Sequence, residues 1–190
     1  MKNPALIVVD VLKCFFDASG SAYYSDSLKV LPNIEKLLSR SRESGIFIAH
    51  AVERHYPGVR DSENNKLSRH CEIGSLDAEY VESVSPRISE HEIEVNKIRY
   101  SSFFATNLDL MLRANDVLEV VIVGVKTNVC IRATAQDAFA LGYKVYVPRD
   151  STNSNRSHLA DASIEDISRY FGDTPTTSEI LVQLDELKKK

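Results

Sequence analysis

The sequence lacks tryptophan, has only three cysteines, and contains no apolar run long enough to cross a bilayer. An odd, small number of cysteines is not typical of a disulfide framework, so we expect reduced thiols and a cytoplasmic location. Only five apolar residues precede Asp10, which is too short for the core of a signal peptide. The sequence therefore gives no indication of a secreted protein or of a membrane protein.

The sequence also has no excess of basic charge. Lysine and arginine number 23 against 27 aspartates and glutamates, which gives a formal net charge of −4. A protein without a basic excess has little to neutralise phosphates with, so nucleic acid is not expected as a partner. Of the 190 residues, 43% are hydrophobic and 26% are charged, a globular composition. No repeat or linker divides the chain, so we expect one domain over residues 1–190.

Short apolar runs alternate with segments at helical spacing along the whole chain. This alternation predicts an α/β fold, a three-layer doubly wound sheet that is mostly parallel and has about six strands. Residues 54–75 are rich in turn formers and form a long excursion, a kind of loop that is often functional. The basic tail 188–190 is expected to fray. Strands are expected at 5–9, 46–52, 93–95, 117–125, 143–147 and 176–181, and helices at 28–45, 107–115, 128–141 and 158–171.

Side chains with chemical function follow four of the predicted strands. Ligands of open parallel sheets bind beyond the carboxyl ends of the strands. Asp10 follows the first strand, Glu53 and His55 the second, Lys97 the third, and Cys130 enters the helix after the fourth. The sequence has no dinucleotide fingerprint, P-loop, C-x-x-C, H-E-x-x-H or G-x-S-x-G motif that would point elsewhere.

Asp10, Lys97 and Cys130 together describe a cysteine hydrolase that acts on a small amide. The helix N-terminus and the ammonium would favour a thiolate, and the carboxylate could accept the thiol proton. Backbone N–H groups at the helix start could hold an oxyanion. Taken singly, Cys130 has an ordinary role in core packing, Asp10 in a strand-end turn and Lys97 as a solvated charge. Their joint placement favours catalysis.

Three segments, residues 5–10, 96–103 and 124–130, resemble the signature segments of the isochorismatase-like cysteine hydrolases. The resemblance runs from residue 4 to about residue 180, and the stretch from Thr127 to Ile131 is its most specific part. It implies a doubly wound sheet and a catalytic triad. It also implies a cis peptide entering Lys126 and an oxyanion hole made by the backbone N–H groups of Lys126 and Cys130. The implied triad is Asp10, Lys97 and Cys130.

Within this family, the chain resembles the nicotinamidase and N-carbamoylsarcosine amidase branch, because it retains the cysteine that these amidases need and that the members which cleave isochorismate do not need. Glu53, His55 and His70 resemble the metal-binding residues of nicotinamidases. One carboxylate and two imidazoles suit a divalent metal such as Zn, Fe or Mn. No organic cofactor is expected.

The chain departs from the nicotinamidase pattern at several positions. Glu53 replaces the usual aspartate, and its longer side chain could shift the carboxylate and so weaken or abolish metal binding. Leu67 replaces an aromatic residue, and Leu12 replaces a glutamine. Lys126 is unusual beside an oxyanion hole, where it could favour an anionic substrate or point to solvent. The candidate walls of the substrate pocket are Phe15, Phe16, Leu67 and Phe103.

The predicted function is a nicotinamidase-like amidohydrolase that releases ammonia from a small-molecule amide through a thioester on Cys130. Two alternatives stay open: hydrolysis of a ureido compound, as in N-carbamoylsarcosine amidases, and a non-catalytic member that binds a metal or ligand. The resemblance also implies a homo-oligomer, either a dimer or a tetramer.

Overall fold

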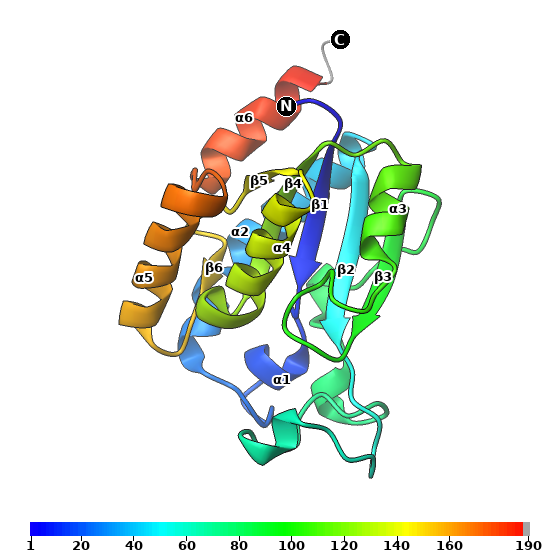
Figure 1. Ribbon diagram of the computed structural model, residues 1–190, viewed down its shortest axis with the longest axis vertical. Helices are drawn as coiled ribbons and strands as arrows, with labels where there is room; N and C mark the ends of the chain where they lie inside the picture. The colour runs from blue at the N-terminus through cyan, green and yellow to red at the C-terminus, as the bar shows by residue number, and fades with distance from the viewer. Residues whose placement is uncertain (188–190) are drawn as a thin grey trace.

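A parallel six-stranded sheet forms the centre of the protein (Figure 1). The computed structural model describes residues 1–187 apart from the side chain of Asn64, and the tail at 188–190 lies outside the described residues. The strand order is β3-β2-β1-β4-β5, with β6 beside β4, and every pairing is parallel. The order reverses between β1 and β4, where folds of this class bind ligands. The strands are β1 Pro4–Val9, β2 Phe47–Glu53, β3 Glu92–Lys97, β4 Glu119–Val125, β5 Lys144–Tyr146 and β6 Thr152–Asn153.

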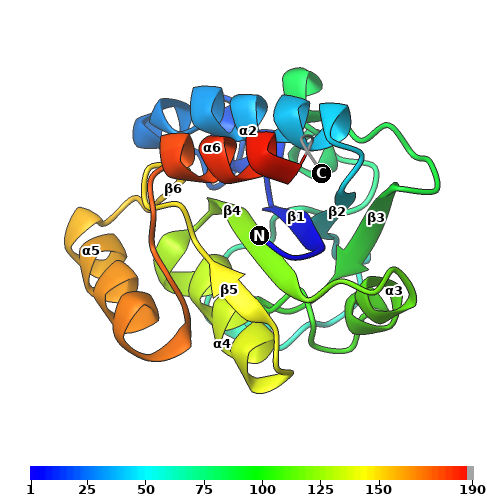
Figure 2. The same cartoon turned by 90° about the horizontal axis from the view of Figure 1, so that it is seen from above.

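Helices cover both faces of the sheet, as expected from the sequence (Figure 2). Helices α2 and α6 lie on one face, and α3, α4 and α5 lie on the other. None of the helices formed by residues 1–187 is long and apolar enough to span a membrane. The α-helices are α1 Lys13–Phe16, α2 Leu31–Glu43, α3 Leu108–Ala114, α4 Arg132–Ala140, α5 Ser157–Asp166 and α6 Thr177–Leu187. Short turns of helix are η1 Ser25–Lys29, η2 Glu63–Asn65, η3 Leu76–Ala78, η4 Glu82–Val84, and the π-helical η5 Thr127–Ile131 and η6 Ile167–Phe171.

The side chains of β1 alternate between two hydrophobic cores. Leu6 and Val8 face the core beneath α2 and α6, whereas Ile7 and Val9 face the core beneath α3 and α4. Both sets are almost fully buried, which explains why β1 is a continuous apolar run. This double burial fixes the end of β1, and with it Asp10, in the middle of the sheet.

The strand expected at 176–181 is wrong, because this segment begins helix α6. The backbone N–H and hydroxyl of Thr176 donate to the Glu179 carboxylate, while the Glu179 N–H donates back to the Thr176 hydroxyl. This capping box stabilises the N-terminus of a helix, and the threonine followed three residues later by a glutamate is its sequence pattern. Ile180 and Leu184, one turn apart, are the buried face. The sixth strand is β6 instead, which at two residues is too short to show a pattern.

Gly124 of β4 permits a close approach between the two central strands. Its φ is +117°, and a Cβ on Gly124 would lie 2.0 Å from the carbonyl oxygen of Val9. No side chain fits at that distance, so β1 and β4 can pair at this level only with glycine.

We therefore expect Gly124→Ala to lower the free energy of unfolding by about 3 kcal/mol or more, since both the positive φ and the clash oppose it. Gly45→Ala is the matched control, because Gly45 has a φ of +64° but no atom within 4 Å of its added Cβ. Urea unfolding of the two variants measures the difference. Equal losses would show that β1 and β4 are not in close contact here.

Candidate active site

The carboxyl ends of β1, β2 and β3 meet at one end of the sheet, next to α1 and the excursion (Figure 1). Asp10 follows β1 with a positive φ of 53°, and its N–H donates to Ala51 of β2 at 3.0 Å. Its Oδ1 accepts a hydrogen bond of 2.7 Å from the backbone N–H of Glu53. Glu53 pairs in register with Lys97 of β3. Parallel registration alone thus brings these three side chains together.

Asp10, Lys97 and Cys130 form one buried cluster. The Lys97 Nζ lies 2.8 Å from Asp10 Oδ2 and 3.7 Å from Cys130 Sγ. The exposed fractions of Asp10, Lys97 and Cys130 are 0%, 1% and 5%. Cys130 stands on η5, directly after β4, and the peptide bond between Val125 and Lys126 is cis, as the resemblance implies. Three residues far apart in sequence therefore share one water-poor site.

Burial and the charge of Lys97 act in opposite directions on the pKa values of Asp10 and Cys130. It raises the pKa of the Cys130 thiol well above its usual value, although Lys97 opposes the shift. Burial also raises the pKa of Asp10, again against Lys97. For Lys97 burial acts downward, but the charges of Asp10 and Cys130 outweigh it and raise the pKa. Desolvation therefore opposes the preformed thiolate expected from a helix N-terminus, while the 2.8 Å contact with Lys97 favours the Asp10 carboxylate.

A second buried cluster lies beside the first and includes the three expected metal ligands. His55 Nε2 is 3.2 Å from Glu53 Oε1, and His70 Nε2 is 3.5 Å from Glu53 Oε2. Burial acts to raise the pKa of Glu53, but the hydrogen bonds from His55 and His70 hold it well below its usual value. The hydrogen bond to Glu53 raises the pKa of His70 to about 9. Glu53 reaches both imidazoles, so its longer arm does not remove it from this cluster.

Glu63 is a fourth member that the sequence analysis missed. Ligand atoms of Glu53, His55, Glu63 and His70 all lie within 4.8 Å of one another. Both carboxylate oxygens of Glu63 are buried without a hydrogen-bond partner, and burial followed by the nearby Glu53 raises its pKa to about 7. A divalent cation would satisfy these orphaned oxygens, so two carboxylates and two imidazoles fit a metal such as zinc. Glu63 lies in the excursion, where no periodicity distinguishes one acidic residue from another.

We expect Glu63→Gln to weaken zinc binding at least about tenfold, because it removes a charged ligand from the cluster. Glu82→Gln is the control, since Glu82 is exposed and outside the cluster. Zinc retained after dialysis against graded chelator measures both variants. Identical retention in wild type and Glu63→Gln would remove Glu63 from the ligand set.

A cavity of about 430 Å³ opens onto both clusters. Cys130, Glu53 and His70 line it, and Phe15 and Leu67 form part of its walls as expected. The described residues that complete the lining are Ser21, Ala22, Ser68, Tyr100, Lys126, Asn128, Val129, Asn155, Arg156 and Leu159.

The cavity lining does not include Phe16 and Phe103, which were expected as pocket walls, whereas Phe15 belongs both to the lining and to a hydrophobic core. Phe16 joins the core beneath α2, and Phe103 stacks on Tyr143 with ring centroids 5.9 Å apart. Lys126, in contrast, lines the cavity, and its Nζ lies 5.5 Å from the ring centroid of Phe15. The cavity therefore has a cation beside the aromatic ring of Phe15.

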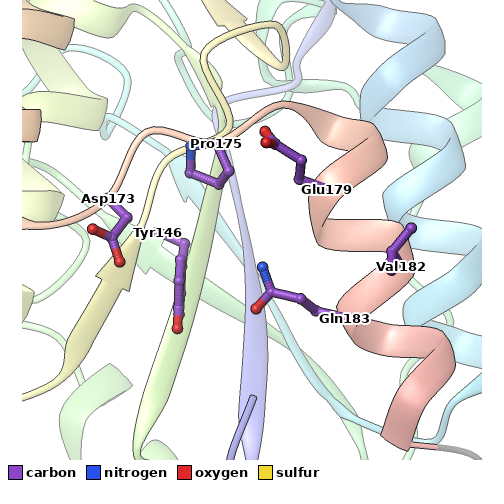
Figure 3. Close-up of a pocket in the computed structure, with 6 residues that line it drawn as sticks. All are labelled: Tyr146, Asp173, Pro175, Glu179, Val182 and Gln183. Atoms are coloured by element: carbon purple, nitrogen blue, oxygen red, sulfur yellow. The ribbon is translucent and has the colours of Figure 1, made fainter.

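Another depression of about 440 Å³ lies between β5 and α6, away from these clusters (Figure 3). Its described lining contains no cysteine, histidine or lysine, and no candidate metal cluster of the described residues includes its members. The lining residues are Tyr146, Asp173, Pro175, Glu179, Val182 and Gln183.

The family profile of the isochorismatase domain matches residues 4–179 of the chain. The chain belongs to the isochorismatase family. A crystal structure of an isochorismatase-like hydrolase from Alkaliphilus metalliredigens superposes with a TM-score of 0.89 at 28% identity, covering 95% of this chain and 98% of the other. The α/β fold predicted from the sequence is thereby confirmed.

Named relatives of this isochorismatase-family chain include amide-cleaving enzymes. A maleamate amidohydrolase from Pseudomonas putida is 29% identical, over 98% of this chain and 89% of the relative. A probable inactive nicotinamidase from Arabidopsis thaliana is 30% identical, over 94% of each chain. A pyrazinamidase from Pyrococcus horikoshii, solved in complex with zinc, has a TM-score of 0.80 at 28% identity, over 92% of this chain and 98% of the other. The relatives bear out the prediction of a hydrolase that acts on C–N amide bonds.

Proposed function

We propose that this isochorismatase-family protein releases ammonia from a small amide through a thioester on Cys130. The observation that carries the proposal is the buried contact of Lys97 with both Asp10 and Cys130, at 2.8 and 3.7 Å, beside a cavity. A carboxylate and an ammonium are costly to bury, and such groups gather at functional sites, which supports a catalytic role for this cluster.

In the first half-reaction Asp10 takes the proton of the Cys130 thiol, and the sulfur attacks the amide carbonyl carbon. The raised pKa of the thiol makes this general base necessary. The backbone N–H groups of Lys126 and Cys130 stabilise the oxyanion. Asp10 then gives its proton to the leaving nitrogen as the C–N bond breaks, so ammonia leaves and an acyl-thioester remains. Lys97 stabilises the Asp10 carboxylate and the developing thiolate throughout.

In the second half-reaction water replaces ammonia. Asp10 removes a proton from water as the oxygen attacks the thioester carbon, and the C–S bond breaks. The proton passes to the sulfur, which restores the thiol and releases a carboxylic acid. Glu53, His55, Glu63 and His70 would hold a divalent metal beside this site, and such an ion acts as a Lewis acid that binds and polarises water or a carbonyl oxygen.

Ammonia release across a panel of nicotinamide, short aliphatic amides and ureido compounds tests the proposal. We expect turnover of at least one amide, and loss of turnover in step with alkylation of Cys130. Preference for a ureido compound would favour the N-carbamoylsarcosine-like alternative instead. A folded, metal-binding protein that is inert towards the whole panel would favour a non-catalytic member and contradict the proposal.

Assembly as a dimer or tetramer and a cytoplasmic location stay predictions of the resemblance and of the cysteine content. Light scattering of the purified chain measures the first.

A further inference from the structure

We infer that Lys126 and Arg156 form a carboxylate-binding subsite in the cavity, so that the preferred substrate is a small amide which also carries a carboxylate. The catalytic half of this inference rests on the proposed amidohydrolase activity. The binding half concerns the cavity alone and can be measured without turnover.

Two cations in the cavity have no acidic partner. Lys126 and Arg156 both line the cavity that holds Cys130. Among residues 1–187, neither side chain forms an ion pair, whereas other basic residues such as Arg132 pair with a carboxylate. Glu53 is the acidic residue in the cavity lining, and its oxygens already face His55 and His70. The positive charge of the cavity therefore lacks a counter-charge from the protein.

Aromatic rings hold the Lys126 ammonium in place. Its Nζ lies 5.5 Å from the ring centroid of Phe15 and 5.6 Å from that of Tyr24. Such contacts attract a cation but do not neutralise it, so the ammonium keeps its charge for a ligand. The Tyr24 hydroxyl is fixed in turn by a hydrogen bond of 2.8 Å to Asn153. Lys126 is therefore positioned before any ligand binds, which lowers the entropy cost of binding.

Two asparagines next to the cations add hydrogen-bond donors. The Ser154 hydroxyl lies 2.6 Å from Asn128 Oδ1 and 3.3 Å from Asn155 Oδ1. The single hydroxyl hydrogen of Ser154 favours the shorter contact, to Asn128, and within the described residues the NH₂ groups of Asn128 and Asn155 have no acceptor. Arg156 is itself the N-cap of the ten-residue helix α5, whose N-terminus adds positive potential.

The chemistry of the ligand follows from this lining. A neutral amide would supply no counter-charge to the half-buried Lys126 or the exposed Arg156, whereas a carboxylate would accept charge-assisted hydrogen bonds from both. Apolar side chains in the same lining suit a short carbon spacer. These side chains are Phe15, Ala22, Leu67, Val129 and Leu159.

The catalytic test compares amides that differ only in charge. Malonamate, succinamate and glutaramate are assayed for ammonia release against neutral analogues in which an isopropyl group replaces the carboxylate. We expect kcat/KM of the best anionic amide to exceed that of its analogue about 100-fold or more. Lys126→Met and Arg156→Met should each lower this ratio about tenfold or more, and Lys126→Arg should keep most of it. Lys36 is an exposed lysine on α2, so Lys36→Met is the charge-matched control and should leave the ratio of the two kcat/KM values unchanged.

The binding test uses succinate and calorimetry on Cys130→Ala, which cannot turn over a substrate. We expect succinate to bind. Lys126→Met and Arg156→Met should each raise the Kd for succinate about tenfold, and Lys36→Met should leave it unchanged. If no amide is hydrolysed but this pattern appears, the proposed activity is wrong and the subsite stands. If amides are hydrolysed without preference for charge, and succinate binding ignores Lys126 and Arg156, the subsite is wrong and the activity stands.

Discussion

Cys130→Ala is expected to lower kcat/KM for ammonia release by at least about 10⁴-fold, because the variant lacks the atom that forms the covalent intermediate. Cys130→Ser should be nearly as inactive. A serine hydroxyl has a much higher pKa than a thiol, and burial, which already raises the pKa of Cys130, would raise it further. A discontinuous ammonia assay with the best substrate of the panel measures both variants.

The matched control for Cys130 is another buried cysteine. Cys14 lies in the hydrophobic core beneath α2 and does not line the cavity. Cys14→Ala should therefore keep a kcat near that of the wild type, although it loses some stability through the missing thiol. If Cys130→Ala folds and retains more than about a tenth of wild-type activity, covalent catalysis by Cys130 is excluded.

Lys97→Met is expected to damage both stability and activity. It removes the ammonium 2.8 Å from Asp10 and leaves a fully buried carboxylate without its charge partner. Breaking a buried ion pair in this way costs about 3–5 kcal/mol. The Asp10 carboxyl would then take up a proton, so the site also loses its general base. We expect kcat to fall about 10³-fold or more, since base and electrostatic stabilisation are lost together.

A double variant separates the two effects of Lys97. Asp10→Asn with Lys97→Met replaces the ion pair by an amide and an apolar side chain. It should recover most of the lost stability but none of the activity. Urea unfolding and ammonia release measure the two properties independently. A Lys97→Met protein that unfolds like the wild type would show that no ion pair exists in the core.

The fold and the clustering of Asp10, Lys97 and Cys130 could be predicted because two simple rules act on them. Apolar runs such as Ala5–Val9 mark buried strands, and the carboxyl ends of parallel strands gather their next residues at one edge. Asp10, Lys97 and Cys130 each follow or end such a strand. Helix α6 differs from the predicted strand because apolar residues near 180 suit either period, whereas the Thr176–Glu179 capping box favours a helix.

The second half of the site could not be predicted by those rules. Glu63 lies in the excursion, whose path depends on side-chain contacts and not on strand register. Arg156 is 26 positions beyond Cys130 and belongs to no signature segment, so nothing in the sequence links it to the cavity. Phe16 and Phe103 follow strand ends as Phe15 does, and only packing decides which of them reach the cavity.

The central claim is that an acyl group passes through Cys130, and intact-mass spectrometry of acid-quenched enzyme tests it most directly. During turnover of a good amide we predict a mass increase equal to the substrate less ammonia, located on the peptide that carries Cys130. Added hydroxylamine should divert the same species to a hydroxamate. Steady ammonia release with no adduct on that peptide and no hydroxamate would contradict the thioester mechanism.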